Sequence, residues 1–269
     1  MKKFTVEPWK GFHDGVVPTT AQEVIEKITE FRLSKALDDQ GLVLNPTDDV
    51  KKTIEYIFTL HKDKHRKATN SQGDDIPYVH HALRTSYFVS RVRNNDPSAV
   101  IPALLIGAIN QSREDNVQRQ KLVSFVKTLQ VAFKVLPVVE VLLVSNVKMS
   151  GGGKFEATKK LWKTNFNAFV VQTVSCLENL DADLVAIAAY GNRGVYFKKR
   201  HFKTSFSEIK KFHTSLLYFM ESLEPTIKND TNVAMIVGQY RDVLEQFAPE
   251  KEGAKKEVSQ SVKEQEVEA

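Results

Sequence analysis

Two short stretches of this chain concentrate histidines that could bind a metal ion or transfer a proton. His61 and His65 are spaced i, i+4, and on a helix they would share one face. Basic residues that would repel a cation surround this pair: Lys62, Lys64, Arg66 and Lys67. The segment is therefore more typical of a solvated basic helix end than of a metal site. His80 and His81 are adjacent on a second predicted helix, where a histidine more often packs or caps than ligates.

Two further segments combine apolar runs with polar residues. Residues 102–112, PALLIGAINQS, place Asn110 and Gln111 near their end. Amide side chains carry no charge and cannot take up a proton as a general base does. Residues 181–194 hold two aspartates and two glycines in a helical pattern. Each glycine in a helix costs about 1 kcal/mol relative to alanine, so its presence indicates close packing or the approach of a ligand.

Helical periodicity predicts the elements that must position these residues. One helix is predicted over 20–39 and a second from Asn45-Pro46 through residue 67, followed by a loop over 68–77. Further helices are predicted over 78–94, 97–111, 116–133, 137–148, 155–180, 183–199, 205–223 and 231–247. The fold class is thus all-α, with about ten helices in a compact arrangement. Residues 1–45 are predicted as an N-terminal extension with one helix, 46–247 as the helical domain, and 248–269 as a charged, disordered tail.

The composition is that of a globular protein from a reducing compartment. The chain has 269 residues, 42% hydrophobic and 26% charged, with one cysteine, Cys176, which excludes an intramolecular disulfide framework. It shows neither an apolar run of roughly 18 residues nor a signal-peptide pattern, so we expect a cytoplasmic protein without a membrane partner. The net charge is +5, and because the tail from Pro249 carries four Lys and six Glu, the rest carries +7. That excess suits an anionic ligand such as a nucleotide better than a nucleic acid.

The order and spacing of these segments resemble the hydrolase domain of the RelA/SpoT family, a group of HD-type metal phosphohydrolases that includes small free-standing alarmone hydrolases. The resemblance covers about residues 50–200. Thr59–Lys67 is similar to the family's Ala-His-Lys-x-x-x-Arg-Lys segment, and Pro77–Leu83 to its Pro-Tyr-Ile-x-His-Pro-Leu segment. Ala103–Ser112 is similar to Ala-Leu-Leu-His-Asp-x-x-Glu-Asp-Thr. Val144–Met149 resembles the Val-Thr-Lys-Leu segment, and Ala189–Arg193 falls where the family has Lys-Leu-Ala-Asp-Arg.

The resemblance implies an HD-type fold and a metal site that this chain has largely lost. In the family, a histidine of the Pro-Tyr motif, the His-Asp pair and a late aspartate hold the metal. The first matches His81, but Ile106 and Gly107 stand at the His-Asp pair and Asn192 at the late aspartate. Because Ile and Gly have no side-chain ligand atoms, the metal site is not intact and no cofactor is expected. Mn is the metal expected if the site should nevertheless function.

The resemblance also places neutral residues where the family has its catalytic acids. Asn110 and Gln111 stand at the Glu-Asp pair, so no catalytic residue is intact, although a polar pocket can persist. Residues that match or lie near the family's nucleotide contacts define the expected nucleotide-binding set: Lys62, Arg66, Lys148, Tyr190, Asn192 and Arg193. We expect a catalytically inactive relative that binds a guanosine alarmone or another nucleotide, or that serves as a protein-interaction scaffold or homo-oligomer. It would act in the cytoplasm, which for a phage protein is that of the host.

The sequence leaves two other functions open. An active phosphohydrolase would need a rearranged metal site drawn from His61, His65, His80, His81 and Asp74 or Asp75, and the long loop before residue 77 leaves room for one. A nucleic-acid-associated protein would use basic helix faces: Lys154, Lys159, Lys160, Lys163 and the segment 198–203. Because such faces are usually solvated, and few aromatic residues alternate with these lysines, a nucleic-acid partner is disfavoured.

Overall fold

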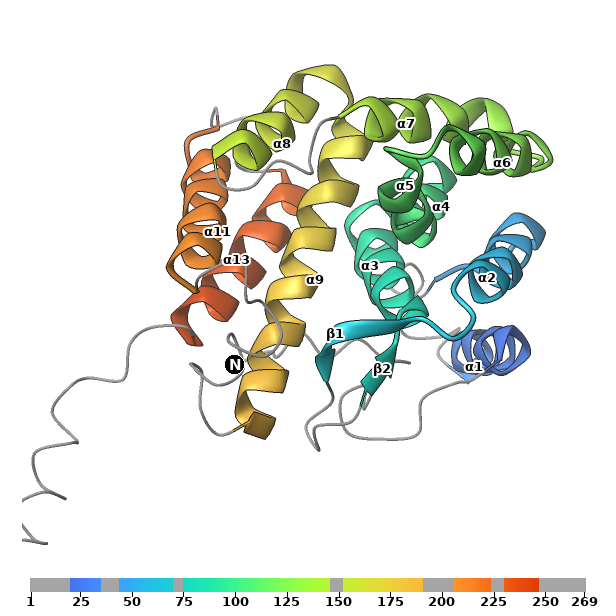
Figure 1. Ribbon diagram of the computed structural model, residues 1–269, viewed down its shortest axis with the longest axis horizontal. Coiled ribbons are helices and arrows are strands. Elements are labelled where there is room, and N and C mark those ends of the chain that lie inside the picture. Colours follow the sequence, from blue (N-terminus) through green and yellow to red (C-terminus); the bar gives the residue numbers. More distant parts are fainter. Residues whose placement is uncertain are drawn as a thin grey trace, which may run out of the picture.

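The computed structural model describes residues 20–34, 44–69, 75–145, 152–190, 206–223 and 230–246 (Figure 1). Within these ranges it has eleven helices and one two-stranded sheet, which confirms the all-α class. The helices are α1 (Ala21–Ser34), α2 (Asp48–Leu60), α3 (Val79–Val92), α4 (Pro97–Leu104), α5 (Ile106–Ser112), α6 (Asn116–Lys127), α7 (Ala132–Val144), α8 (Gly152–Thr164), α9 (Phe166–Tyr190), α11 (Phe206–Glu221) and α13 (Thr231–Gln246). Strands β1 (His65–Thr69) and β2 (Asp75–Pro77) pair antiparallel. None of these helices has both the length and the apolar character required to cross a membrane.

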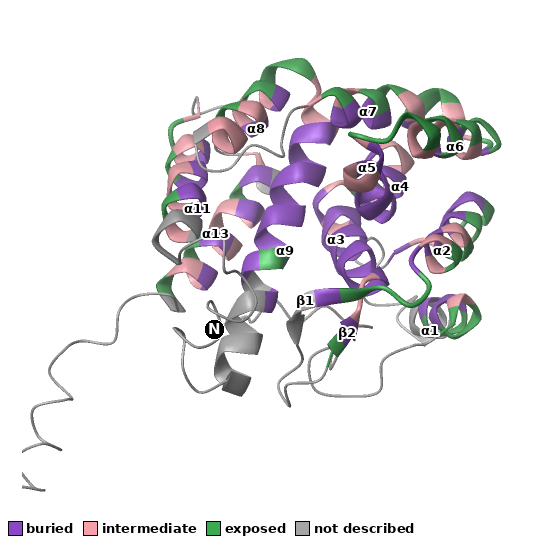
Figure 2. Ribbon diagram, in the orientation of Figure 1, coloured by how far each residue is buried: buried purple, intermediate pink, exposed green. Residues whose placement is uncertain are grey.

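Helix α9 forms the centre of the fold. It contacts α3, α4, α7, α8, α13 and strand β1 (Figure 1). From Ala168 to Leu180 every residue except Asn179 is buried, and Figure 2 shows this stretch as the most continuously buried part of the helix. A helix that is buried on all sides lies inside the core. Any charged side chain on this stretch must therefore find its partner inside the protein.

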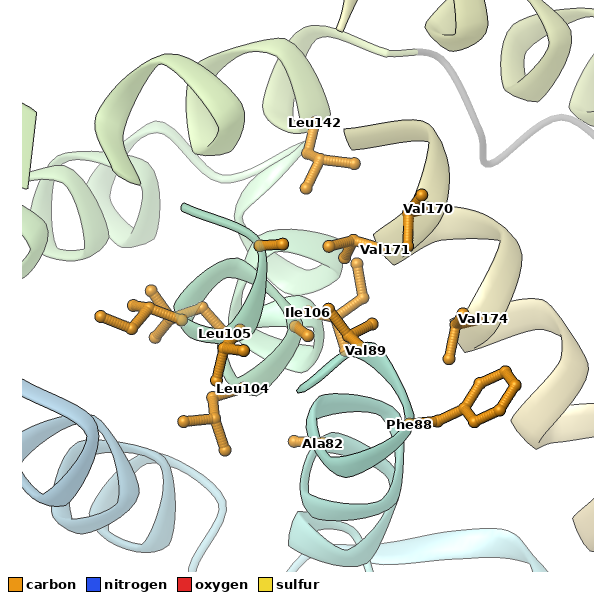
Figure 3. Packing of buried hydrophobic residues seen from close by; sticks show 14 of the residues in the cluster. Ala82, Phe88, Val89, Leu104, Leu105, Ile106, Leu142, Val170, Val171 and Val174 are labelled. Atoms are coloured by element: carbon orange, nitrogen blue, oxygen red, sulfur yellow. The ribbon is translucent and has the colours of Figure 1, made fainter. Parts of the chain in front are cut away.

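Helices α3, α4, α5 and α7 meet α9 in the core, as the labelled side chains of Figure 3 show. Val89 from α3, Ile106 from α5 and Val171 from α9 are all fully buried there. The segment predicted as a single helix over 97–111 is two helices, because the chain turns at Leu105 with φ −84° and ψ 0°. After this turn α5 runs in a different direction from α4. Gly107 on α5 then lies close to His61, at the end of α2, and to Tyr78, at the start of α3.

The helix predicted through residue 67 is wrong beyond Leu60. Asp63 has a φ of 62°, in the left-handed region that terminates helices, and the chain then runs extended as β1. The loop predicted over 68–77 likewise contains the paired residues of β2. His61 is the C-cap of α2 whereas His65 lies in β1, so the two histidines do not share a helix face.

The helix predicted over 116–133 is also wrong, because it ends at Lys127 and a new helix begins at Ala132. The start of α7 is held by Asp49 from α2, whose two carboxylate oxygens each accept a main-chain N–H, from Gln130 and Val131, at 3.0 Å. Asp49 lies about 80 positions away in the sequence, so local periodicity does not reveal the boundary.

The helices predicted over 155–180 and 183–199 have their boundary in a different place. The chain breaks at Asn165, whose side-chain oxygen accepts the N–H of Ala168 at 3.0 Å and caps α9. Beyond this cap, α9 runs to Tyr190 without a break near residue 181. One long helix therefore contains both the buried stretch Ala168–Leu180 and the first part of the polar segment 181–194.

Helix α1 lies in the predicted N-terminal extension. It packs against α2, and its Val24 and Ile28 are fully buried in the main hydrophobic core. The predicted disordered tail, residues 248–269, lies outside the described residues and stays a prediction.

Candidate functional site

A buried carboxylate, Glu178 on α9, is the centre of a polar cluster between α9, α3 and β1. Its side chain is fully buried and forms two hydrogen bonds with Arg66 of β1, at 2.5 Å to Nη1 and 2.9 Å to Nη2. His81 Nδ1 contacts the second carboxylate oxygen, and Arg84 Nε lies 3.7 Å from the first. Burial by itself raises the pKa of Glu178, but the charges of Arg66, His81 and Arg84 outweigh it and hold that pKa well below its usual value. Glu178 is therefore ionised, and its negative charge is balanced by the positive side chains that surround it.

His81, the residue that the resemblance assigns to a metal, is fully engaged within the protein. Its Nδ1 faces Glu178, and its Nε2 lies 3.0 Å from the hydroxyl of Ser175, one turn earlier on α9. The side chain is buried at 3% exposure. A metal-bound histidine needs one ring nitrogen for the cation, and here both nitrogens already have protein partners.

The space beside Gly107, where the resemblance implies a His-Asp pair, is filled by rings. A Cβ atom on Gly107 would lie 2.7 Å from Cε1 of Tyr78 and 2.8 Å from Nε2 of His61. These two rings pack against each other with centroids 4.8 Å apart. Ile106 points into the hydrophobic core and is fully buried. Gly107 therefore leaves no room for a longer, oxygen-bearing side chain without movement of Tyr78 or His61.

His61 is held as a neutral imidazole at the edge of this cluster. Burial, assisted by Lys64 and His81, lowers the pKa of His61 from 6.5 to about 4. Gln111 lies 3.4 Å from its Nδ1 and also accepts a hydrogen bond from Lys64 at 3.0 Å. The buried Nε2 of His61 has no hydrogen-bond partner among the described residues. This nitrogen is the one that faces Gly107.

The residues expected to bind nucleotide are not brought together in one place. Lys62 is exposed after the end of α2, whereas Arg66 is buried in the Glu178 cluster. Lys148, Asn192 and Arg193 lie outside the described residues, and Tyr190 ends α9 with a side chain that is not described. Asn110 is half-buried on α5.

Three residues of the cluster were not predicted as site residues: Glu178, Arg84 and Ser175. A signal for Glu178 does exist in the sequence, since it is the only charged residue in the stretch Ala168–Leu180, where a charge requires a buried partner. Its partner Arg66 is 112 positions away, and no local pattern links the two. Arg84 and Ser175 are recognised only from the packing of α3 on α9.

The donor set does not fit a divalent metal. Among the described residues no group of three or more His, Cys, Asp or Glu side chains is placed to share an ion. The rearranged site considered from the sequence would also require residues that lie in different surroundings. His80 is fully buried, His65 and Asp75 are exposed, and Asp74 lies outside the described residues.

Two lysines of α8 make contacts within the protein, whereas Lys160 and Lys163 are exposed. Lys154 Nζ lies 4.7 Å from the ring centre of Phe212, and Lys159 Nζ lies 5.9 Å from that of Phe155 and 5.7 Å from that of Phe219. The contacts to Phe212 and Phe219 join α8 to α11. The segment 198–203 lies outside the described residues.

Comparison with known proteins gives no match for this chain, either to a family model, to a curated protein or to a solved structure.

Proposed function

We propose that this chain is a catalytically inactive relative of the RelA/SpoT-type guanosine polyphosphate 3′-pyrophosphohydrolases and works as a protein-interaction scaffold. The observation that carries the proposal is the guanidinium of Arg66 bound to Glu178 beside His81. A guanidinium neutralises a carboxylate as a metal ion would. It stays protonated and has no open coordination position, so it cannot generate the hydroxide that attacks a phosphate.

The packing around Gly107 supports the same conclusion. A metal with its water would need the space that the rings of Tyr78 and His61 occupy. Gln111, which stands where the resemblance places a catalytic acid, is neutral and is engaged by Lys64. No group at this position can take the proton of an attacking water.

A scaffold role is favoured over retained nucleotide binding because of the burial of Arg66. Both of its terminal nitrogens bind Glu178, and the residue is only 7% exposed. A nucleotide phosphate would have to displace a carboxylate that is already in place, in a cluster shielded from solvent. Of the expected nucleotide-binding residues, Lys62 is the one whose side chain is described as exposed.

The test is a pyrophosphate-release assay with guanosine tetraphosphate and Mn²⁺, run beside an active alarmone hydrolase. We expect no turnover above the rate without protein. Turnover that is lost in His81→Ala would overturn the proposal in favour of the family mechanism. Turnover that survives His81→Ala but is lost in His61→Ala would instead support the rearranged metal site.

Nucleotide binding is tested separately by thermal shift with guanosine tetraphosphate, GDP and GTP. A ligand that binds only the folded state raises the melting temperature. We expect no rise at about 1 mM nucleotide, a concentration that would reveal even weak binding. A rise that is absent in Lys62→Ala would contradict the scaffold version and favour an inactive nucleotide-binding protein.

A further inference from the structure

Helix α7 presents an apolar face on each of its two sides. Its inner face packs into the core through five buried residues: Val135, Val138, Val139, Leu142 and Leu143. Its outer face repeats at helical spacing through Phe133, Pro137 and Val144, which are exposed, with Leu136 and Val141 half-buried beside them. Phe133 and Val144 are each 73% exposed. A helix that is apolar on both sides is normally covered on both.

The neighbouring helix α6 shows that this pattern is specific to α7. Its exposed residues are mostly polar: Asn116, Gln120, Lys121, Ser124 and Lys127. Figure 2 shows α6 and α7 side by side along one edge of the molecule, each with exposed residues on its outer side. The exception on α6 is Val117, which is 59% exposed. Val117 lies in the first turn of α6. This turn is close to the C-terminal end of α7, because Arg113, just before α6, donates a hydrogen bond to the carbonyl oxygen of Leu142.

The charges on the α7 outer face are self-complementary in one arrangement. Lys134 and Glu140 are the two charged residues of α7, both are exposed, and each is three positions from Pro137. If two α7 helices pack antiparallel about a two-fold axis near Pro137, each Lys134 lies at the level of the partner's Glu140. In a parallel arrangement like charges would lie at the same level.

We propose that a second copy of this chain covers the α7 outer face, in an antiparallel two-fold contact centred near Pro137. Such a contact buries the apolar stripe and pairs the only two charges of the helix. It is independent of the proposed loss of phosphohydrolase chemistry, since it uses none of the residues around Glu178.

The size of the contact sets its strength. Thirteen residues at about 1.5 Å per residue give α7 a length of about 20 Å. Two such helices with the start of α6 bury less area than a standard interface of about 1,600 Å², so we expect a weak dimer with a dissociation constant in roughly the micromolar range. The association must therefore be measured over a range of concentrations.

Sedimentation velocity of the full chain from about 5 to about 500 µM covers that range. We expect the wild type to shift from monomer to dimer. Lys134→Glu and Glu140→Lys should each weaken the dimer by at least about tenfold, because each brings like charges together twice. When these two variants are mixed, every charge again faces an opposite one, and the mixture should associate as strongly as the wild type.

A matched control uses Lys211→Glu on α11, an exposed lysine on a helix that is not part of the proposed contact, which should leave the dimer unchanged. Far-UV circular dichroism on each variant checks that the fold is intact, as expected for exposed positions. A chain that stays monomeric at all concentrations would overturn the proposal and leave the face to a different partner. Association that the mixture of variants fails to restore would overturn the antiparallel arrangement.

Discussion

Gly107 is the residue at which this chain differs most in size from the aspartate that the resemblance implies. The atoms that face it belong to two rings that are themselves packed, so they cannot move aside as the tip of a flexible side chain would. The small residue at position 107 and the close packing of His61 and Tyr78 therefore depend on each other. An aspartate introduced at Gly107 would meet these two rings before it could bind a metal ion.

Gly107→Ala should destabilise the protein although alanine is the better helix former. The added Cβ would lie 2.7 Å from Tyr78 and 2.8 Å from His61, and such overpacking costs about 1–3 kcal/mol in the free energy of unfolding. Gly238→Ala in α13 is the matched control, because its Cβ would meet nothing within 4 Å. That variant should gain about 0.5–1 kcal/mol. Urea denaturation measures both, and equal effects at the two glycines would contradict the tight packing at Gly107.

Glu178→Gln tests whether the cluster is structural. The amide keeps the shape of the carboxylate but leaves Arg66 and Arg84 without its negative charge in a buried place, which should cost about 3–5 kcal/mol in the free energy of unfolding. Glu221→Gln is the comparison, since Glu221 pairs with Arg241 at 2.7 Å on the surface and should cost less than about 1 kcal/mol. Urea denaturation of the two variants distinguishes a buried ion pair from an exposed one. A small effect at Glu178 would mean that its charge is not needed.

At the scale of elements, helical periodicity predicts that the helices exist but not where each one ends. The boundaries of α6, α7 and α9 depend on polar contacts, and for α7 the contact comes from a distant residue, Asp49. The end of α2 depends on the backbone conformation of Asp63, which residue type alone does not impose. The same limit applies to the site. His81, Arg66 and Gln111 could be identified from motif spacing, whereas Glu178 required knowledge of how α9 packs on α3.

Asp49→Ala should loosen the start of α7. The variant removes a charged acceptor from two main-chain N–H groups just before α7, and loss of hydrogen bonds to a charged group costs about 1.5–3 kcal/mol. Asp48→Ala is the control, because Asp48 is also in the first turn of α2 but is exposed, and should cost less than about 1 kcal/mol. Hydrogen exchange should be faster at the amides of Gln130 and Val131 for Asp49→Ala alone. Unchanged exchange at these two amides would contradict the role of Asp49 in holding the chain before α7.

At the scale of the whole molecule, neutral histidines are distributed through two separate parts of the core. His61 lies by the Glu178 cluster, and His213 of α11 is buried against Tyr240 of α13, with ring centres 5.7 Å apart. Burial, together with Lys154, lowers the pKa of His213 from 6.5 to about 3, and the pKa of His61 is lowered to about 4. The fold therefore requires both imidazoles to be uncharged, and acid should act on it in two places at once.

The free energy of unfolding should consequently fall as the pH is lowered from 6.5 toward 4. In this window the two histidines bind protons in the unfolded chain but not in the folded chain. Each histidine therefore adds up to about 1.4 kcal/mol per pH unit to the pH dependence of the free energy of unfolding. Glu178 does not contribute in the upper part of the window: its lowered pKa gives stability that is complete above about 4.5 and is lost only as the pH falls through the depressed value. The slope between pH 6.5 and 5 therefore belongs to the histidines.

His213→Phe should reduce that slope by about half, because it removes one of the two protonations and keeps a ring against Tyr240. Urea denaturation at about pH 6.5, 6.0, 5.5 and 5.0 measures the slope for the wild type and the variant, because this range lies within about one and a half units of the ordinary histidine pKa. His65→Asn, at an exposed position, is the control and should leave the slope as it is. If His213→Phe also leaves the slope unchanged, the buried imidazole must accept its proton inside the folded protein, and the acid sensitivity must come from His61 alone.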